Sequence, residues 1–182
     1  MIANRFARQM AVILAVAAFP ALTSPAFAEG THSGAHRHDA GKAGKAANTS
    51  RTLEIILYDN YYEPETIDVV AGETVRFIVR NQGELVHEFN IATPSMHRAH
   101  QEEMQMMVDH GVLEASSINT EAAKAMQASM GHGMHDEPNS VLLEPGQTGE
   151  VIWTFPVPGN LEFACNVPGH YDAGMVGEFS IN

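Results

Sequence analysis

The chain is expected to fold as an all-β antiparallel sandwich, because short runs of alternating apolar and polar residues end at turn residues. Val75, Phe77 and Val79 alternate with polar neighbours, and turn sequences occur at 71–72 and 81–83. A period of two is typical of strands with one buried face. About seven such runs with turns between them indicate two packed sheets.

The phase of this alternation predicts which side chains face the core. Further runs occupy residues 53–57 (interrupted at Ile56), 67–70, 85–91, 147–155, 161–165 and 175–181. In the run at 85–91, His87 shares the apolar face with Phe89, whereas Glu88 and Asn90 share the polar face. An imidazole on a buried face needs a polar partner. His87 is therefore either a core histidine bonded to a carbonyl group or a metal ligand.

Three soft ligand types lie within eleven residues near the C-terminus. Cys165, His170 and Met175 are each separated by four residues, and a Pro-Gly pair shapes the turn before the histidine. Taken singly, they could be a buried thiol, a solvated imidazole and a core thioether. Together they supply three of the four ligands of a His₂Cys copper site with a weak axial Met, and one imidazole is missing. His87 is the only histidine in the strand region upstream of Cys165, so we choose it as the fourth ligand.

Residues 1–28 are predicted to be a cleavable signal peptide that directs export to the periplasm. Arg5 and Arg8 form a basic start, residues 10–19 are apolar, and Ala26-Phe27-Ala28 is a cleavage signal. The apolar run is too short to span a bilayer, which argues against the alternative, a membrane anchor. An exported chain with a single cysteine can form no internal disulfide, and metal coordination would protect that thiol.

Residues 29–51 are rich in Gly, Ala, His, Lys and Ser, and we expect a disordered leader. Its histidines (His32, His36 and His38) could bind metal weakly or could be incidental. The folded domain is then expected at 52–182. The formal net charge of −12 argues against nucleic acid or anionic membrane as a partner and suits metal cations or a basic docking surface. We expect a monomer that is not inserted in a membrane after signal cleavage.

The alternation stops between residues 94 and 140, which we interpret as an insertion. Helices are plausible at 95–110 and 120–130, with Gly111 and Gly131 as stop signals. Its methionines and histidines could be secondary Cu(I) ligands, since thioethers and imidazoles select Cu(I), or the methionines could pack against the sandwich. The candidate ligands are Met96, His97, His100, Met104, Met107, His110, Met126, Met130, His132, Met134 and His135.

The sequence resembles the cupredoxins, the plastocyanin and azurin superfamily, over residues 52–93 and 141–182. The motifs that carry this resemblance are Glu-Leu-Val-His87-Glu-Phe and Cys165-x₄-His170-x₄-Met175. It implies a Greek-key β-sandwich and one type 1 copper held by His87, Cys165, His170 and, axially, Met175. Among cupredoxins, the chain is most similar to periplasmic copper-tolerance proteins with a Met/His-rich insertion. Small electron carriers lack such an insertion and commonly have Asn where this chain has Glu88.

These observations support three hypotheses about function. The first is a periplasmic copper-handling protein that binds copper and exchanges one electron, with additional Cu(I) in the insertion. The second is a mobile electron carrier with a redox partner protein, with His170 as the electron's exit. The third, a cuprous oxidase, is weaker, because apart from His36 and His38 the chain has no His-x-His pair for an oxygen-reducing cluster. We therefore expect a copper protein that is not an enzyme.

Overall fold

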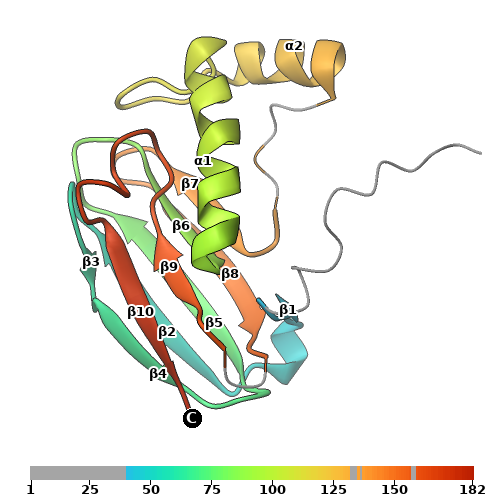
Figure 1. Ribbon diagram of the computed structural model, residues 1–182, viewed down its shortest axis with the longest axis vertical. Coiled ribbons are helices and arrows are strands. Elements are labelled where there is room, and N and C mark those ends of the chain that lie inside the picture. Colours follow the sequence, from blue (N-terminus) through green and yellow to red (C-terminus); the bar gives the residue numbers. More distant parts are fainter. Residues whose placement is uncertain (1–39, 132–134, 136, 157–158) are drawn as a thin grey trace, which may run out of the picture. The chain divides into compact units, whose positions relative to one another are not determined.

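Two five-stranded sheets form the protein in a computed structural model that describes residues 40–131, 135, 137–156 and 159–182 (Figure 1). One sheet has the order β1-β8-β5-β2-β3 and the other has the order β4-β10-β9-β6-β7. The strands are β1 (Lys42–Ala43), β2 (Arg51–Leu57), β3 (Tyr62–Glu63), β4 (Thr66–Val69), β5 (Thr74–Asn81), β6 (His87–Ala92), β7 (Ser140–Leu143), β8 (Thr148–Thr154), β9 (Glu162–Ala164) and β10 (Val176–Ile181). The signal-peptide prediction falls outside the described residues.

The seven predicted runs are all strands, but the sheets are mixed rather than purely antiparallel. β2 lies parallel to β5, and β4 lies parallel to β10, whereas the other pairs are antiparallel. Alternation reports which face of a strand is buried and carries no information on the direction of its neighbour. The expectation that all neighbouring strands run antiparallel was therefore wrong, although the two-sheet sandwich is confirmed.

Residues 40–51 are ordered, so the expected disordered leader is wrong for this part. β1 pairs with the end of β8, and the indole N–H of Trp153 donates to the carbonyl oxygen of Ala40 at 2.7 Å. Gly41 has a φ of 97°, and a Cβ there would lie 2.4 Å from the carbonyl oxygen of Thr154. The glycine content that suggested flexibility instead allows close contact with β8.

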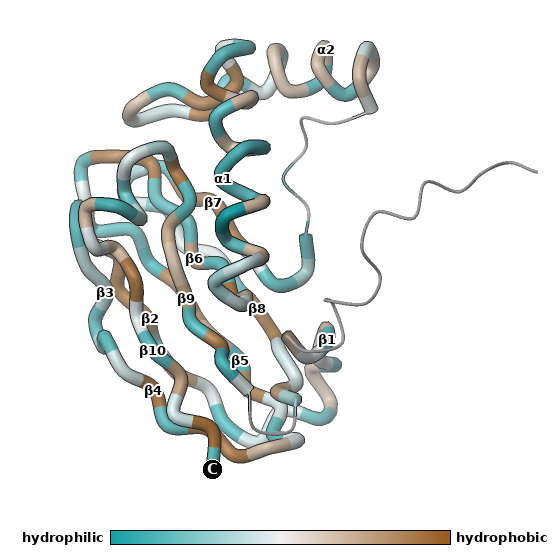
Figure 2. Tube along the Cα trace, in the orientation of Figure 1, coloured by the Kyte–Doolittle hydropathy of each residue, from teal (hydrophilic) through white to brown (hydrophobic). Residues whose placement is uncertain are grey.

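The side chains that the alternation predicts to face inward are buried in the core. Val151, Trp153 and Phe155 are buried, as are Phe163 and Cys165. These side chains belong to one apolar cluster that both sheets contribute to. Figure 2 shows hydrophobic positions along the strands, whereas the tube of the first helix is largely hydrophilic. One compact core therefore joins the two sheets.

The insertion forms two helices, α1 (Pro94–Asp109) and α2 (Thr120–Met130), close to the predicted ranges. The Thr93 hydroxyl caps α1, and Gly131 ends α2 in the left-handed conformation with a φ of 74°. α1 runs alongside β6 (Figure 1). Within the described residues, no helix is long and apolar enough to cross a bilayer.

The register between β9 and β10 is fixed by a glycine beneath an aromatic ring. Gly177 pairs with Phe163, and a Cβ on Gly177 would lie 2.1 Å from the Phe163 ring. Phe163 lies two residues before Cys165, and Gly177 lies two residues after Met175. The packing of this pair therefore sets the positions from which two of the predicted copper ligands project.

We expect Gly177→Ala to destabilise the protein by about 2 kcal/mol, because the new methyl group overpacks the core. Urea unfolding measures this loss. In a Phe163→Leu background the same substitution should cost clearly less, since the smaller side chain leaves room. An equal cost in both backgrounds would show that the ring contact is not responsible.

Candidate metal centre

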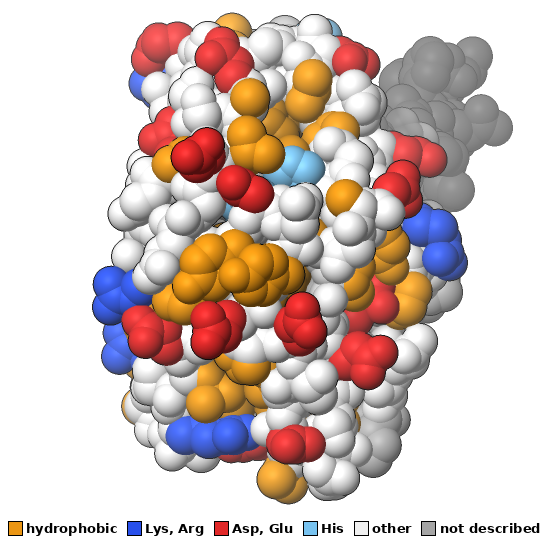
Figure 3. All heavy atoms as spheres, turned by 90° about the vertical axis from the view of Figure 1, so that its left-hand side faces the viewer, with side chains coloured by type: hydrophobic (Ala, Val, Ile, Leu, Met, Phe, Trp, Pro, Cys, Tyr) orange, Lys and Arg blue, Asp and Glu red, His pale blue; other side chains and the backbone are white. Residues whose placement is uncertain are grey.

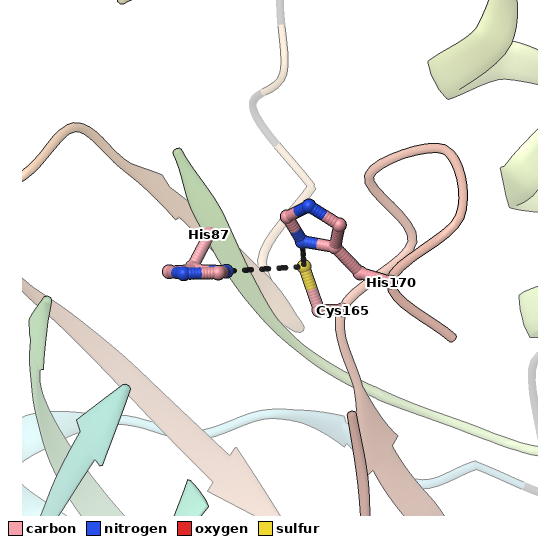
Figure 4. A group of neighbouring side chains, drawn as sticks. All are labelled: His87, Cys165 and His170. Carbon is pink, nitrogen blue, oxygen red and sulfur yellow. Dashed lines mark hydrogen bonds between the residues drawn. The ribbon is translucent and has the colours of Figure 1, made fainter. Parts of the chain in front are cut away.

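Three side chains from distant parts of the chain converge at one end of the sandwich. His87 begins β6, Cys165 follows β9, and His170 lies in the loop between β9 and β10 (Figure 4). The Cys165 Sγ lies 3.2 Å from His170 Nδ1 and 3.9 Å from His87 Nδ1. All three potential ligand atoms lie within 4.8 Å of one another. The structure thus brings together three of the four residues predicted from the sequence as ligands.

The fourth predicted ligand, Met175, is tied to the same loop through its backbone. Its N–H donates to the His170 carbonyl oxygen at 3.0 Å, and its own carbonyl oxygen accepts from the Cys165 N–H at 3.2 Å. Its side chain is fully buried in the core cluster that includes Cys165. Gly174, with a φ of 94°, makes the reversal before it. The loop therefore closes on itself before the last strand begins.

The Cys165 thiol is fully buried, and burial raises its pKa. The N–H of Glu88 donates to the Cys165 Sγ at 3.3 Å. A thiolate is the form that ligates a metal, and a nearby cation stabilises that form. The environment therefore favours the thiol when no cation is near. The thiol loses its proton when a metal cation binds in its place.

His87 is oriented by Asp59, a residue that the sequence analysis did not identify. Its Nε2 lies 3.0 Å from Asp59 Oδ1, which also accepts the N–H groups of Glu84 and Leu85. Burial lowers the pKa of His87 and outweighs the effect of Asp59. In the neutral ring, a proton on Nε2 leaves the Nδ1 lone pair directed toward Cys165. A carboxylate behind a ligating histidine is a common feature of metal sites.

Gly83 leaves room for this carboxylate–histidine pair. A Cβ at residue 83 would lie 2.3 Å from Asp59 Oδ1 and 2.9 Å from His87 Nε2. Burial also lowers the pKa of His170, as does the neighbouring His87 ring, whose centroid is 4.9 Å away. Both imidazoles are consequently held in the neutral form that binds metal.

Two neutral imidazoles, a buried thiol and a buried thioether form the donor set of a type 1 copper site. Sulfur donors favour Cu(I), and imidazoles also suit Cu(II), so one set of ligands can hold both oxidation states. The residues present therefore match copper in donor type, and three of the donor atoms already lie within 4.8 Å of one another.

A second cluster lies on the opposite face of β6. Glu88 and Asn90 share this face, as predicted, and the structure shows that both are buried beneath the insertion. Period-two alternation identifies the polar face but does not show what covers it.

Burial raises the pKa of Glu88, but His100 and His135 outweigh this effect and hold the pKa of Glu88 well below its usual range. Conversely, burial lowers the pKa of His100, but the Glu88 carboxylate outweighs it and raises the pKa to about 10.

The other candidate ligands in the insertion have varied surroundings. Met104, Met107 and Met126 lie in an apolar cluster with Val86 and Leu113, as expected for packing. Cu(I) binding by the methionines stays a prediction. His97 is buried beside Asn166, Met96 contacts the main core, and His110 and Met130 are exposed. His132 and Met134 lie outside the described residues.

Comparisons with known proteins agree with this geometry. Residues 12–106 match the family described as Cupredoxin-like domain. The chain is 46% identical over 157 residues to the copper-resistant cuproprotein CopI of Pseudomonas aeruginosa, which covers 81% of this chain and 84% of that protein. It is 38% identical over 184 residues to the copper-resistant cuproprotein CopI of Rubrivivax gelatinosus, with 96% of both chains covered.

A solved structure of auracyanin B has a similar fold. The TM-score is 0.56, and the match covers 79% of this chain and 96% of that one at 21% sequence identity. At that identity the likeness concerns the fold alone.

Cys165→Ser should abolish the intense visible band of the copper-loaded protein, because a hydroxyl group cannot supply thiolate-to-copper charge transfer. Absorption spectroscopy measures the band, and far-ultraviolet circular dichroism verifies the fold. A band of full strength in a folded Cys165→Ser variant would contradict the assignment of Cys165 as a ligand.

Gly83→Ala should displace Asp59 from His87 and weaken copper binding by about 10- to 100-fold, the usual cost of disturbing a residue behind a ligand. Competition with a copper chelator measures the affinity. Gln82→Ala is the control, because it shortens an exposed side chain in the same turn. If the two variants bind copper equally well, Gly83 has no role in positioning His87.

Proposed function

The chain belongs to the cupredoxin family, and on that premise we propose that it is a periplasmic copper-handling protein that confers copper tolerance. The observation that carries the proposal is the convergence of His87, Cys165 and His170 in a chain similar over most of its length to copper-resistant cuproproteins. Together with the thioether of Met175, these residues would hold one copper ion.

Bound copper supplies a one-electron couple between Cu(I) and Cu(II). The protein's residues keep the donor geometry the same in both states. Asp59 fixes the His87 ring, and the Glu88 N–H stabilises the Cys165 sulfur as negative charge develops on it. The loop hydrogen bonds of His170 and Met175 restrict the remaining donors. Because these contacts hold the donors in place, little rearrangement would accompany a change between Cu(I) and Cu(II), with the electron passing to or from a redox partner protein.

The surface favours cations and a basic partner. Figure 3 shows acidic side chains spread over one face, with Lys and Arg mainly near its edges. The formal net charge of −12 agrees with this view. Such a field raises the local concentration of copper ions and would steer a positively charged redox partner. We infer that the protein is exported by residues 1–28 and acts as a monomer without enzymatic activity.

A mobile electron carrier is the second candidate, and one observation favours it. His170 is half-buried and lies at the end of the sandwich, so an electron could leave through its exposed edge. Copper stoichiometry distinguishes the two functions, because a carrier needs one copper per chain. A cuprous oxidase remains the weakest alternative.

Removal of the gene from the source bacterium should lower copper tolerance, and the parent gene should restore it. A gene carrying Cys165→Ser should fail to restore growth on copper, because the thiolate ligand is absent. A gene carrying Lys124→Ala should succeed, since the Lys124 side chain is 66% exposed and belongs to no candidate ligand set. Normal tolerance without the gene, or with Cys165→Ser, would favour the carrier function.

A further inference from the structure

We propose that Glu88, His100 and His135 form a second metal site, which binds a divalent transition-metal cation such as Zn²⁺ or Cu²⁺ between the sandwich and the helical insertion. The site shares no side chain with the His87, Cys165 and His170 cluster. It therefore does not depend on the function proposed above.

The three donor atoms form a compact triangle. His100 Nε2 lies 3.0 Å and His135 Nε2 lies 2.8 Å from Glu88 Oε1, and the two nitrogens lie 3.2 Å apart. Metal–nitrogen and metal–oxygen bonds to zinc are about 2.0–2.2 Å long. One ion placed just outside the plane of this triangle can contact all three atoms at such distances without movement of the backbone.

Both histidines have a carboxylate near the nitrogen that points away from the triangle. His100 Nδ1 lies 3.0 Å from Glu103 Oε2, and His135 Nδ1 lies 3.6 Å from Glu137 Oε2. For His100 this hydrogen bond favours a proton on Nδ1, which leaves the Nε2 lone pair free for an ion, whereas the separation at His135 is too long for a hydrogen bond. This carboxylate–histidine order is typical of metal sites and supports the assignment independently of the triangle.

Because the cluster is buried, its carboxylate and imidazole lone pairs need a positive charge nearby to compensate them. The Glu88 side chain is 0% exposed, and those of His135 and His100 are 6% and 13% exposed. A carboxylate oxygen and two imidazole lone pairs directed at one point repel each other in a poorly solvated site. Either protons on the imidazoles or a metal cation can neutralise them. A metal cation satisfies all three donors at once.

The donor types select the class of metal. Oxygen and imidazole donors suit Zn²⁺, Cu²⁺ and similar divalent ions, whereas Cu(I) prefers sulfur. Asn90 and Ser140 also donate to Glu88 Oε1, at 3.0 and 2.6 Å, which fixes the position of this oxygen. The two histidines were named as possible Cu(I) ligands, and their pairing with a carboxylate favours a divalent ion instead.

Calorimetric titration with Zn²⁺ tests the proposal in the full mature chain, with the first site filled by Cu(I) under anaerobic conditions. The parent should bind one Zn²⁺ per chain at this site. His100→Asn and His135→Asn should each weaken binding by at least about tenfold, because even residues behind ligands cost that much. His110→Asn is the matched control, since it changes an exposed histidine at the end of the same helix, and should bind as the parent does.

Zn²⁺ binding should persist in Cys165→Ser, which separates this site from the copper site. Should His100→Asn fail to fold, as shown by circular dichroism, His135→Asn decides the test, because it lies outside the helices. The proposal is overturned if the parent binds no Zn²⁺, which would identify the cluster as a protonated ion pair. It is also overturned if the folded His135→Asn variant binds Zn²⁺ as tightly as the control, which would place the ion elsewhere.

Discussion

Glu88 places a fully buried carboxylate between β6 and α1, and much of the structure is arranged around it. An uncompensated buried charge costs several kcal/mol. Here one oxygen is close to His100, His135, Asn90 and Ser140, and the other accepts both the backbone and side-chain N–H groups of Asn166. Each hydrogen bond to a charged group contributes about 1.5–3 kcal/mol. The insertion, two strands and the residue after Cys165 are thereby fixed to one side chain.

This arrangement links the two clusters through a single strand. His87 and Glu88 are consecutive, so the pleat of β6 directs their side chains to opposite faces. The Glu88 N–H contacts the Cys165 sulfur, and its carboxylate contacts the following residue, Asn166. A displacement of β6 would therefore change both clusters. The stiffness of this strand, which is buried along its whole length, keeps the ligand geometry constant.

The sequence predicted the copper-type donors well, because three of them are close along the chain and their parity follows from local alternation. Asp59 could not be predicted, since its contact with His87 depends on a loop meeting the start of β6, 28 positions further along the chain. Glu88 was placed on the correct face of β6, but its burial beneath the insertion could not be predicted, because a polar pattern does not show what covers that face. β1, β3 and β7 were missed, because β1 and β3 have only two residues each and the sequence of β7 does not alternate. Long-range pairing limits what a local pattern can show.

The outward face of β6 remains polar although a helix covers it. Glu88 and Asn90 would be equally compatible with water, so a smaller sandwich could gain such an insertion without new core residues in this strand. Its histidines would need only to meet side chains already present on the surface. The same strand is therefore compatible with a sandwich that carries the helices and with one in which water covers this face.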